Sequence, residues 1–294
     1  MKKNIVRSSL RSTLKIAAPG LLGLMLINSA EAGWFQAYNG GDWDTVTWGS
    51  YLGGTGTGAS YVESDGSVYI DQGPTVFLTH DQTIGSLTVQ RGAVKTGTLD
   101  LNTASTTLTV AGTATIGSLG NSALGTLDIS GGSISVGGAT TFNTNGVLNI
   151  SDGSFSGAGT TMNGLMTISG GAMTDTGTSL FGSVSTVNFD FGGLDGSLMS
   201  SWDAADYTIT SGAQLNLLGL SSVGTGTYDL VTYSGTRTGD YDGSYSVTGL
   251  GAGLVGTVEY DADSMYLNVA AVPEPSSAAL LGLGGLALIL RRRK

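Results

Sequence analysis

One short phrase, a polar residue between two apolar ones, returns seven times between Ser86 and Gln214, and it constrains the fold more than any other feature. The last apolar residues of the copies fall at positions 89, 110, 129, 150, 168, 189 and 209. A period of roughly 20 residues that drifts slightly is typical of a coiled repeat. The alternation predicts half-buried strands with the polar residue outward. The copies are Leu87-Thr88-Val89, Leu108-Thr109-Val110, Leu127-Asp128-Ile129, Leu148-Asn149-Ile150, Met166-Thr167-Ile168, Val187-Asn188-Phe189 and Tyr207-Thr208-Ile209.

A glycine follows most copies at a fixed offset of three residues. These glycines are Gly92, Gly132, Gly153, Gly171, Gly192 and Gly212, while Gly112 comes one place early. Glycine turns into positive φ without steric cost, so a glycine at this offset indicates a corner. Strands and corners in alternation predict a right-handed parallel β-solenoid with about seven rungs of about 20 residues. Neighbouring rungs of such a stack lie about 4.8 Å apart.

Other readings of the repeat agree less well with the composition. A leucine-rich repeat needs a denser leucine frame and an asparagine ladder, and propeller blades are about twice this length. Disorder is the main alternative because Gly, Ser and Thr dominate the chain. The alternation argues against it, since a disordered segment has no reason to keep β-branched residues in register over seven copies.

The charge is distributed unevenly along the chain. The 294 residues carry a formal net charge of −10, contain no cysteine, and are long enough to bury a sizeable core. Between Gly33 and Ala271, however, twenty acids face only Arg91, Lys95 and Arg237, a net charge of −17. This excludes a nucleic-acid partner for the body of the chain. Without disulfides, the fold must be stabilised by stacking and backbone pairing.

Residues 1–32 have the pattern of a secretory signal peptide. A basic start precedes the apolar run from Ile16 to Ile27, and the small residues Ala30 and Ala32 follow. We expect signal peptidase to cleave after Ala32. The run is too short to span a bilayer stably, although an uncleaved anchor is the alternative.

Residues 33–83 are rich in aromatic side chains, including Trp34, Trp43 and Trp48. The first rung of a solenoid exposes a sheet edge that must be covered. We therefore interpret the segment as an N-terminal cap with irregular first rungs. The functional alternative is a platform on which sugar rings stack.

The regular repeats are expected over residues 84–225, and a second β-rich cap over residues 226–271. Strand-like segments at Thr227 to Tyr233, Val255 to Tyr260 and Met265 to Val269 are separated by Gly and Asp turns. Their spacing predicts antiparallel hairpins that close the far end of the coil.

Residues 272–294 have three parts. Val272, Pro273, Glu274 and Pro275 come first, an uncharged run from Ser276 to Leu290 follows, and the basic residues Arg291, Arg292, Arg293 and Lys294 end the chain. The run predicts a C-terminal transmembrane helix, but 15 residues extend only about 22 Å, so the span is marginal. The basic cluster favours a cytoplasmic end.

This order of elements resembles the PEP-CTERM sorting signal of exported proteins in bacteria that make exopolysaccharide. Pro273, Glu274 and Pro275 match the positions that give the signal its name. The resemblance implies recognition by an exosortase, a membrane protease or transpeptidase that removes the tail. It also implies that the helix holds the protein in the inner membrane before processing. The body resembles, more loosely, the passenger repeats of autotransporter adhesins, as in residues 127–134 and 166–173.

Candidate catalytic and metal-binding residues are few. His80 is the only histidine and there is no cysteine, so Ser-His, Cys-His and histidine-metal sites are largely excluded. The pairs Asp42/Asp44, Asp240/Asp242 and Asp261/Asp263 could bind Ca²⁺ weakly, but solvated turn acids are the simpler interpretation. We expect no metal and no cofactor.

Polysaccharide lyases and hydrolases also use parallel β-helices, so an enzyme is the remaining alternative. Such enzymes need acids clustered on neighbouring rungs. The expected outward column Thr88, Thr109, Asp128, Asn149, Thr167, Asn188 and Thr208 has one acid, and no Asp is in register with Arg91 or Lys95. The sequence therefore predicts a non-catalytic structural or adhesin-like protein of the cell envelope or extracellular matrix, associated with exopolysaccharide or biofilm. The alternatives are a carbohydrate-binding module and a β-helix lyase or hydrolase.

Overall fold

The computed structural model describes residues 33–50, 55–57, 62, 64–90, 95–119, 122–192, 201–273 and 277–292. The chain divides into two units, residues 1–31 and 32–294, and all described residues belong to the second. The expected signal peptide, with Ala30 and Ala32, lies outside the described residues.

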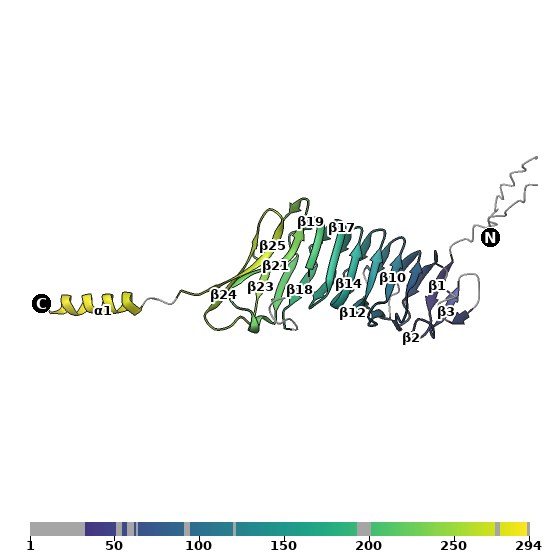
Figure 1. Cartoon of the computed structure of the whole chain (residues 1–294), viewed down its shortest axis with the longest axis horizontal. Helices are drawn as coiled ribbons and strands as arrows, with labels where there is room; N and C mark the ends of the chain where they lie inside the picture. Colours follow the sequence, from purple (N-terminus) through teal and green to yellow (C-terminus); the bar gives the residue numbers. More distant parts are fainter. Residues whose placement is uncertain are drawn as a thin grey trace, which may run out of the picture. The chain divides into compact units, whose positions relative to one another are not determined.

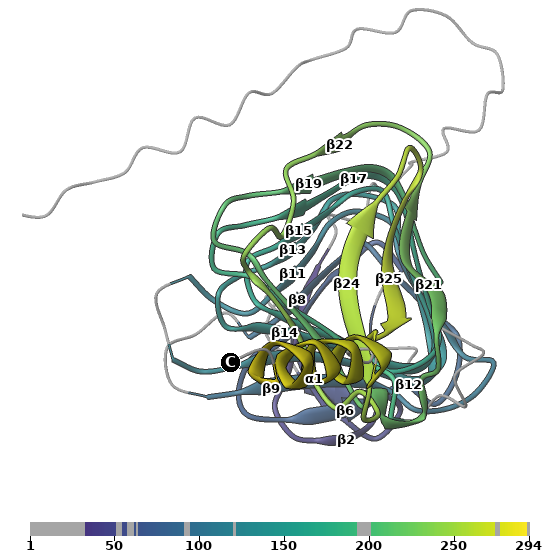
Figure 2. The same cartoon turned by 90° about the vertical axis from the view of Figure 1, so that its left-hand side faces the viewer.

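Strands dominate the described part of the chain and are linked into one large, mostly parallel sheet (Figure 1). The sheet winds around a common interior, with three faces in each complete turn (Figure 2). This is the arrangement of a β-solenoid. Its handedness and its number of rungs stay predictions.

Three ladders of parallel strands make the three faces. The first face contains β1 (Trp34–Ala37), β5 (Ser67–Ile70), β8 (Ser86–Val89), β11 (Ala114–Ile116), β13 (Thr140–Phe142), β15 (Thr160–Met162), the second halves of β17 (Ala172–Phe181) and β19 (Ser201–Ile209), and β22 (Arg237–Thr238). The second contains β2 (Gly41–Asp42), β6 (Thr75–Phe77), β9 (Gly97–Leu101), the first halves of β12 (Gly125–Val136) and β14 (Gly146–Gly157), β16 (Leu165–Ile168), β18 (Thr186–Asp190), β20 (Gln214–Leu218) and β23 (Tyr245–Val247). The third contains β7 (Gln82–Ile84), β10 (Thr107–Val110), the second halves of β12 and β14, the first halves of β17 and β19, and β21 (Gly226–Tyr233).

The seven repeated phrases do not form one column, so the prediction that they stack directly on one another is wrong. Four of them, ending at Ile129, Ile150, Ile168 and Phe189, stack in register on the second face. Residues 87–89 and 207–209 lie on the first face, and residues 108–110 on the third. The reason is that each turn has three strands, and all of them alternate apolar and polar residues.

The length of a turn also varies more than expected. On the second face, the positions paired from rung to rung are Leu99, Leu127, Leu148, Met166, Val187 and Leu215. The first and last of these intervals are clearly longer than the three between them. The expected period therefore describes the three central intervals only. In the earlier of the two longer turns, the additional residues lie between β9 and β10 and between β11 and β12.

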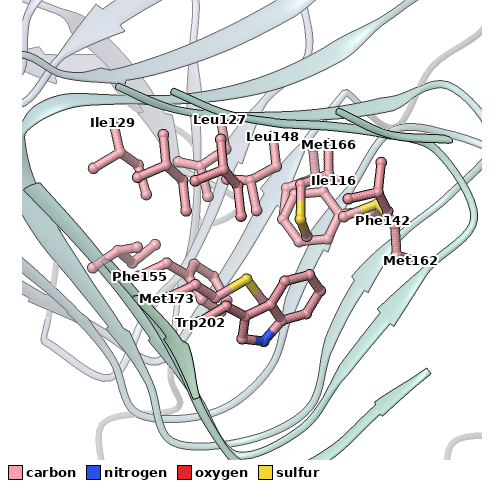
Figure 3. Packing of buried hydrophobic residues seen from close by; sticks show 14 of the residues in the cluster. Ile116, Leu127, Ile129, Phe142, Leu148, Phe155, Met162, Met166, Met173 and Trp202 are labelled. Atoms are coloured by element: carbon pink, nitrogen blue, oxygen red, sulfur yellow. The ribbon is translucent and has the colours of Figure 1, made fainter. Parts of the chain in front are cut away.

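Apolar side chains from all three faces meet in the interior (Figure 3). Ile150 is fully buried between its paired neighbours Ile129 and Ile168. Towards the C-terminal coils the interior becomes aromatic, and the ring centroids of Phe181 and Trp202 are 5.1 Å apart. The predicted division into inward apolar and outward polar residues is confirmed in all seven repeated phrases. In β17, however, Asp175 and Ser179 are buried and Leu180 points outward.

Positive φ is confirmed at three of the predicted corner glycines, Gly153, Gly171 and Gly212, but not at Gly112, Gly132 and Gly192. Gly153 and Gly171 have φ of +89° and +70°. A Cβ atom on Gly153 would lie 2.1 Å from the carbonyl oxygen of Gly132 on the adjacent rung. Adjacent corners are thus packed backbone against backbone, which leaves no room for a side chain. Gly92 lies outside the described residues.

Antiparallel strands occur at both ends. At the start, β3 (Thr47–Ser50) pairs with β1 and with β4 (Thr55–Thr57), and the parallel ladders already include β5 and β6. At the far end, after the 3₁₀ turn Leu220–Ser222, the strand β25 (Ser264–Ala271) pairs antiparallel with β21 and with β24 (Leu254–Tyr260). The predicted C-terminal hairpin is therefore confirmed. The helix α1 (Ser277–Arg291) follows.

Candidate functional site

The C-terminal tail begins directly at the terminal hairpin. Ala271, the last residue of β25, pairs with Leu254 of β24. The backbone N–H of the next residue, Val272, donates a hydrogen bond of 2.8 Å to the carbonyl oxygen of Gly253. Val272 and Pro273 are exposed, and Glu274 and Pro275 lie outside the described residues. The first residue of the candidate sorting motif is thus held by the folded domain.

The helix α1 presents apolar side chains that no other described residue covers. Leu283, Leu286, Leu288, Ile289 and Leu290 are all more than half exposed. Arg291 is in the last turn, where a cation interacts favourably with the helix dipole, and the Arg292 N–H bonds to the Leu288 carbonyl. Arg293 and Lys294 lie outside the described residues.

None of the helices described here is long and apolar enough to cross a membrane. The helix α1 has 15 residues. The C-terminal transmembrane helix therefore stays a prediction.

A ladder of polar side chains runs along the outside of the second face. The Asn216 amide donates to Asn188 Oδ1 at 2.9 Å, and the Asn188 amide donates to Thr167 Oγ1 at 3.3 Å. The Ser246 hydroxyl donates to Asn216 Oδ1 at 3.1 Å. Stacked amides and hydroxyls therefore bond successive rungs to one another outside the backbone ladder.

Two carboxyl groups stand side by side in the same column. Asp100 of β9 pairs directly with Asp128 of β12, and Asn149 follows on the next rung. Burial raises the pKa of both carboxyl groups, and the negative charge of Asp128 raises the pKa of Asp100 further. The expectation of a single acid in the outward column was wrong, because residues 88, 109 and 208 belong to other faces.

An acidic pocket of about 930 Å³ lies between the end of the third face and the terminal hairpin. Its lining includes Asp203, Asp229, Asp261 and Asp263. Asp203 accepts a hydrogen bond from the Thr232 hydroxyl. Of these four acids, the sequence pattern indicates only the pair Asp261/Asp263. The pairing of β19, β21 and β25 is needed to bring the other two beside it.

Hydrogen bonds within its turn account for the geometry of Asp261. Its Oδ1 accepts the N–H of Asp263 at 3.2 Å and the N–H of Ser264 at 2.6 Å, and these donors lower the pKa of the carboxyl. Asp240 likewise accepts the Asp242 N–H at 3.2 Å. Over the part of the chain described, no three His, Asp or Glu side chains are grouped so that they could hold a metal ion.

The aromatic residues of the first coil are divided between the core and the surface. Trp43 and Trp48 are fully buried, with centroids 4.8 Å apart. Two of the three tryptophans proposed for a sugar platform are therefore not accessible to sugar. Trp34 and Tyr69, however, lie on the outside of the first face as a half-buried pair with centroids 5.8 Å apart and planes at 84°.

The single histidine joins the first turns of the coil. His80 Nδ1 lies 3.0 Å from Asp44 Oδ2, and the Gln82 amide contacts the other ring nitrogen. Asp42, the partner of Asp44 in the sequence pattern, is exposed in β2. Asp44 therefore contacts His80, which is a different role from the weak Ca²⁺ binding considered for the Asp42/Asp44 pair. Arg91 lies outside the described residues.

Comparison with known proteins identifies the tail and leaves the body without a counterpart. The family model of the PEP-CTERM protein-sorting motif matches residues 271–294. No curated protein and no solved structure matches the chain. The motif indicates export, sorting to the cell envelope and processing by an exosortase-type membrane enzyme. The chain therefore carries a PEP-CTERM protein-sorting motif that begins where its last β-strand ends.

Proposed function

We propose that the protein is a structural or adhesin-like component of the cell envelope or extracellular matrix, associated with exopolysaccharide or biofilm and without catalytic activity. The observation that supports this most is the combination of a sorting motif with coils whose outward columns consist mainly of Thr, Ser and Asn. Such surfaces repeat one weak hydrogen-bonding group at every rung. Repetition suits contact with an extended polymer better than with a small substrate.

Two processing events belong to this proposal. Signal peptidase removes residues 1–32 during export, and an exosortase cuts the tail near the Pro-Glu-Pro segment. Before the second cut, α1 and its basic end hold the chain at the inner membrane. With a length of about 22 Å the helix is short of a bilayer core of about 30 Å, which suits a transient association.

A polysaccharide-cleaving β-helix is the second candidate, because Asp100 and Asp128 are adjacent. Rungs about 4.8 Å apart bring two carboxyl groups near the separation of about 5–5.5 Å that retaining glycosidases use. The raised pKa of Asp100 would suit a general acid. The counter-argument is that the same column continues as a hydrogen-bonded amide ladder, as expected of structural packing.

The two candidates make different predictions for polysaccharide recovered from the host. A hydrolase releases reducing ends from it, and both Asp100→Asn and Asp128→Asn abolish the release. A structural component releases none, and loss of the protein lowers the amount of polysaccharide that cells retain. Unchanged retention, adhesion and biofilm in the deletion strain would contradict the structural proposal.

Mass spectrometry of protein recovered from the cell surface and the medium tests the processing. The expected chain begins at Gly33 and ends close to Pro275. A recovered chain that still carries Arg291 to Lys294 would show that the tail is retained, and sorting by cleavage would then be wrong.

A further inference from the structure

The three faces of the coil differ in the side chains that they present to the outside. On the first face, the residues paired from rung to rung form one outward column without a single charge. We call this the threonine column, and its members are Gln36, Tyr69, Thr88, Thr115, Thr141, Thr161, Leu180, Thr208 and Thr238.

Four consecutive rungs of this column carry threonine. Thr88 pairs with Thr115, Thr115 with Thr141, and Thr141 with Thr161. All four are half-buried in the middle of strands whose flanking residues point inward. Threonine is restricted at χ1, so hydroxyl and methyl groups are presented at a regular spacing of about 4.8 Å.

Aromatic rings continue the same surface at its N-terminal end. Tyr69 lies on the rung next to that of Thr88. In the Trp34–Tyr69 pair, the edge of one ring meets the face of the other. Tyr and Trp combine a broad apolar face with a polar group, which suits partners that are apolar on one side and hydroxylated at their edges.

The absence of charge in this column contrasts with the rest of the body, whose net charge is −17 between Gly33 and Ala271. The second face carries Asp100 and Asp128 in one of its two outward columns. The third face presents Ser and Thr until Thr174 and then Asp203, which lines the acidic pocket. The second face also has a neutral outward column, at residues 75, 98, 126, 147, 165, 186 and 214, but the threonine column is longer and is the one that the Trp34–Tyr69 pair continues. A polyanion is repelled by the body and finds no cation in this column.

We propose that the threonine column and the Trp34–Tyr69 pair form a binding track for a neutral polysaccharide chain. This deepens the proposed association with exopolysaccharide and rests on it. The hydroxyl groups exchange hydrogen bonds with sugar hydroxyls, while the aromatic faces and threonine methyl groups contact the apolar faces of the sugar rings. Each contact is weak, and affinity comes from repetition along the polymer.

The area of the face argues for a polymer and against a second copy of the chain. Eight intervals of about 4.8 Å and strands about 10 Å long give a surface of roughly 380 Å². A stable protein interface buries about 800 Å² on each partner. A single polysaccharide chain, in contrast, needs only a narrow and continuous track.

Affinity electrophoresis of the processed protein tests this assignment. The probe is polysaccharide recovered from the host's surface and medium, separated by anion exchange into neutral and acidic fractions. The wild-type protein should be retarded by the neutral fraction. The variant with Thr115→Glu and Thr141→Glu should bind at least tenfold more weakly, because two carboxylates on adjacent rungs interrupt the neutral track. Tyr69→Ala should weaken binding several-fold.

The matched control carries the same two charges on the third face. Ser135→Glu and Ser156→Glu also lie on adjacent rungs and point outward, and this variant should bind like the wild type. Melting temperatures of both variants show whether each remains folded.

Binding to neither fraction, binding only to the acidic fraction, or equal loss in both double variants would overturn the assignment. If the wild-type protein self-associates in sedimentation experiments and the Thr115/Thr141 variant does not, the first face would instead bind a second copy of the chain. A second measurement distinguishes failure of the binding track from failure of the proposed function. It is the amount of polysaccharide retained by a deletion strain that expresses each variant. If the Thr115/Thr141 variant restores retention fully in a deletion strain, the envelope role stands and the track is wrong.

Discussion

Asp175 occupies the space that Gly157 leaves open on the preceding rung of the third face. The two residues are paired in the ladder, and a Cβ atom on Gly157 would lie 2.6 Å from Asp175 Oδ1. Asp175 is 2% exposed, and its carboxyl accepts hydrogen bonds from the hydroxyls of Thr160 at 3.0 Å and Ser179 at 2.6 Å. Burial raises its pKa although these bonds act in the opposite direction. A buried carboxyl group is thus tolerated because a glycine faces it.

Gly157→Ala should destabilise the protein by about 1–3 kcal/mol, because the new methyl group displaces a carboxylate that two hydroxyls hold in place. Thermal unfolding of the purified variant measures this. Gly224→Ala is the matched control, since no atom lies within 4 Å of a Cβ there. In combination with Asp175→Ala, the effect of Gly157→Ala should be smaller than in the wild type. Additive effects of the two substitutions would mean that they do not interact.

The adjacent carboxyl groups of Asp100 and Asp128 predict an unusual dependence of stability on pH. A folded-state pKa above the ordinary value of 3.8 means that the folded protein binds protons more tightly than the unfolded chain. The stability contributed by the protonated pair is therefore fully present below about pH 3.8 and decreases as the pH rises through the raised pKa values.

Asp100→Asn should accordingly raise the melting temperature at pH 7, and the gain should shrink as the pH falls towards 4. The new amide also extends the Asn and Thr ladder of the same column. The exposed Asp65→Asn is the control and should give a difference that is small at both pH values. A variant less stable than the wild type at pH 7 would show that the carboxylate makes a favourable contact.

The alternation within a strand could be predicted from the sequence, but the assignment of strands to faces could not. Val89, Val110 and Ile129 all point inward as expected, since period-two alternation decides this locally. They nevertheless lie on three different faces, because each turn contributes three alternating strands and the length of the corners decides which of these strands falls on the 20-residue period. Corner length is set by loops whose sequence carries no period.

Which acidic residues lie close together could not be predicted from the sequence either. Asp261 and Asp263 are visible as a pair in the sequence, whereas Asp203 joins them only because β19 pairs with β21 and β21 with β25. Asp100 was overlooked because its phrase, Leu99-Asp100-Leu101, does not follow the regular period of the other copies. The sorting motif, by contrast, is linear and could be predicted from residue order.

The interior position of Ile150 predicts a large effect of a charge. Ile150→Asp buries a carboxylate between Ile129 and Ile168 without a donor, which should cost more than about 4 kcal/mol and cause unfolding at growth temperature. The neighbouring Asn149→Thr changes only an outward residue and should shift the melting temperature little. Circular dichroism melts compare the two variants, and equal melting temperatures would show that the inward and outward assignment is wrong.

The hydrogen bond from Val272 to Gly253 predicts that the folded domain restricts access to the motif. From Val272 to the start of α1 at Ser277 the chain can span at most about 18 Å. An insertion of eight Gly and Ser residues between Ala271 and Val272 should speed processing in a pulse-chase experiment, because the motif then extends away from the hairpin. The same insertion in the exposed turn at Gly224 is the control. Slower or unchanged processing would indicate that the enzyme also uses the hairpin surface.

The motif itself gives the last prediction. Pro273 is exposed directly after the hairpin, and an exposed, extended segment is what a processing enzyme needs. Replacing Pro273, Glu274 and Pro275 by alanine should remove the recognised side chains and favour helix in the segment before α1. The variant should remain cell-bound with an intact C-terminus, whereas the wild type loses the residues beyond about Pro275. Intact-mass measurement of both proteins from the native host distinguishes the two forms. Exchanging Arg291 and Arg292 for lysine keeps the charge at the helix end and should leave processing unchanged, so a loss of processing in that variant would mean that the enzyme reads the guanidinium groups and not charge alone.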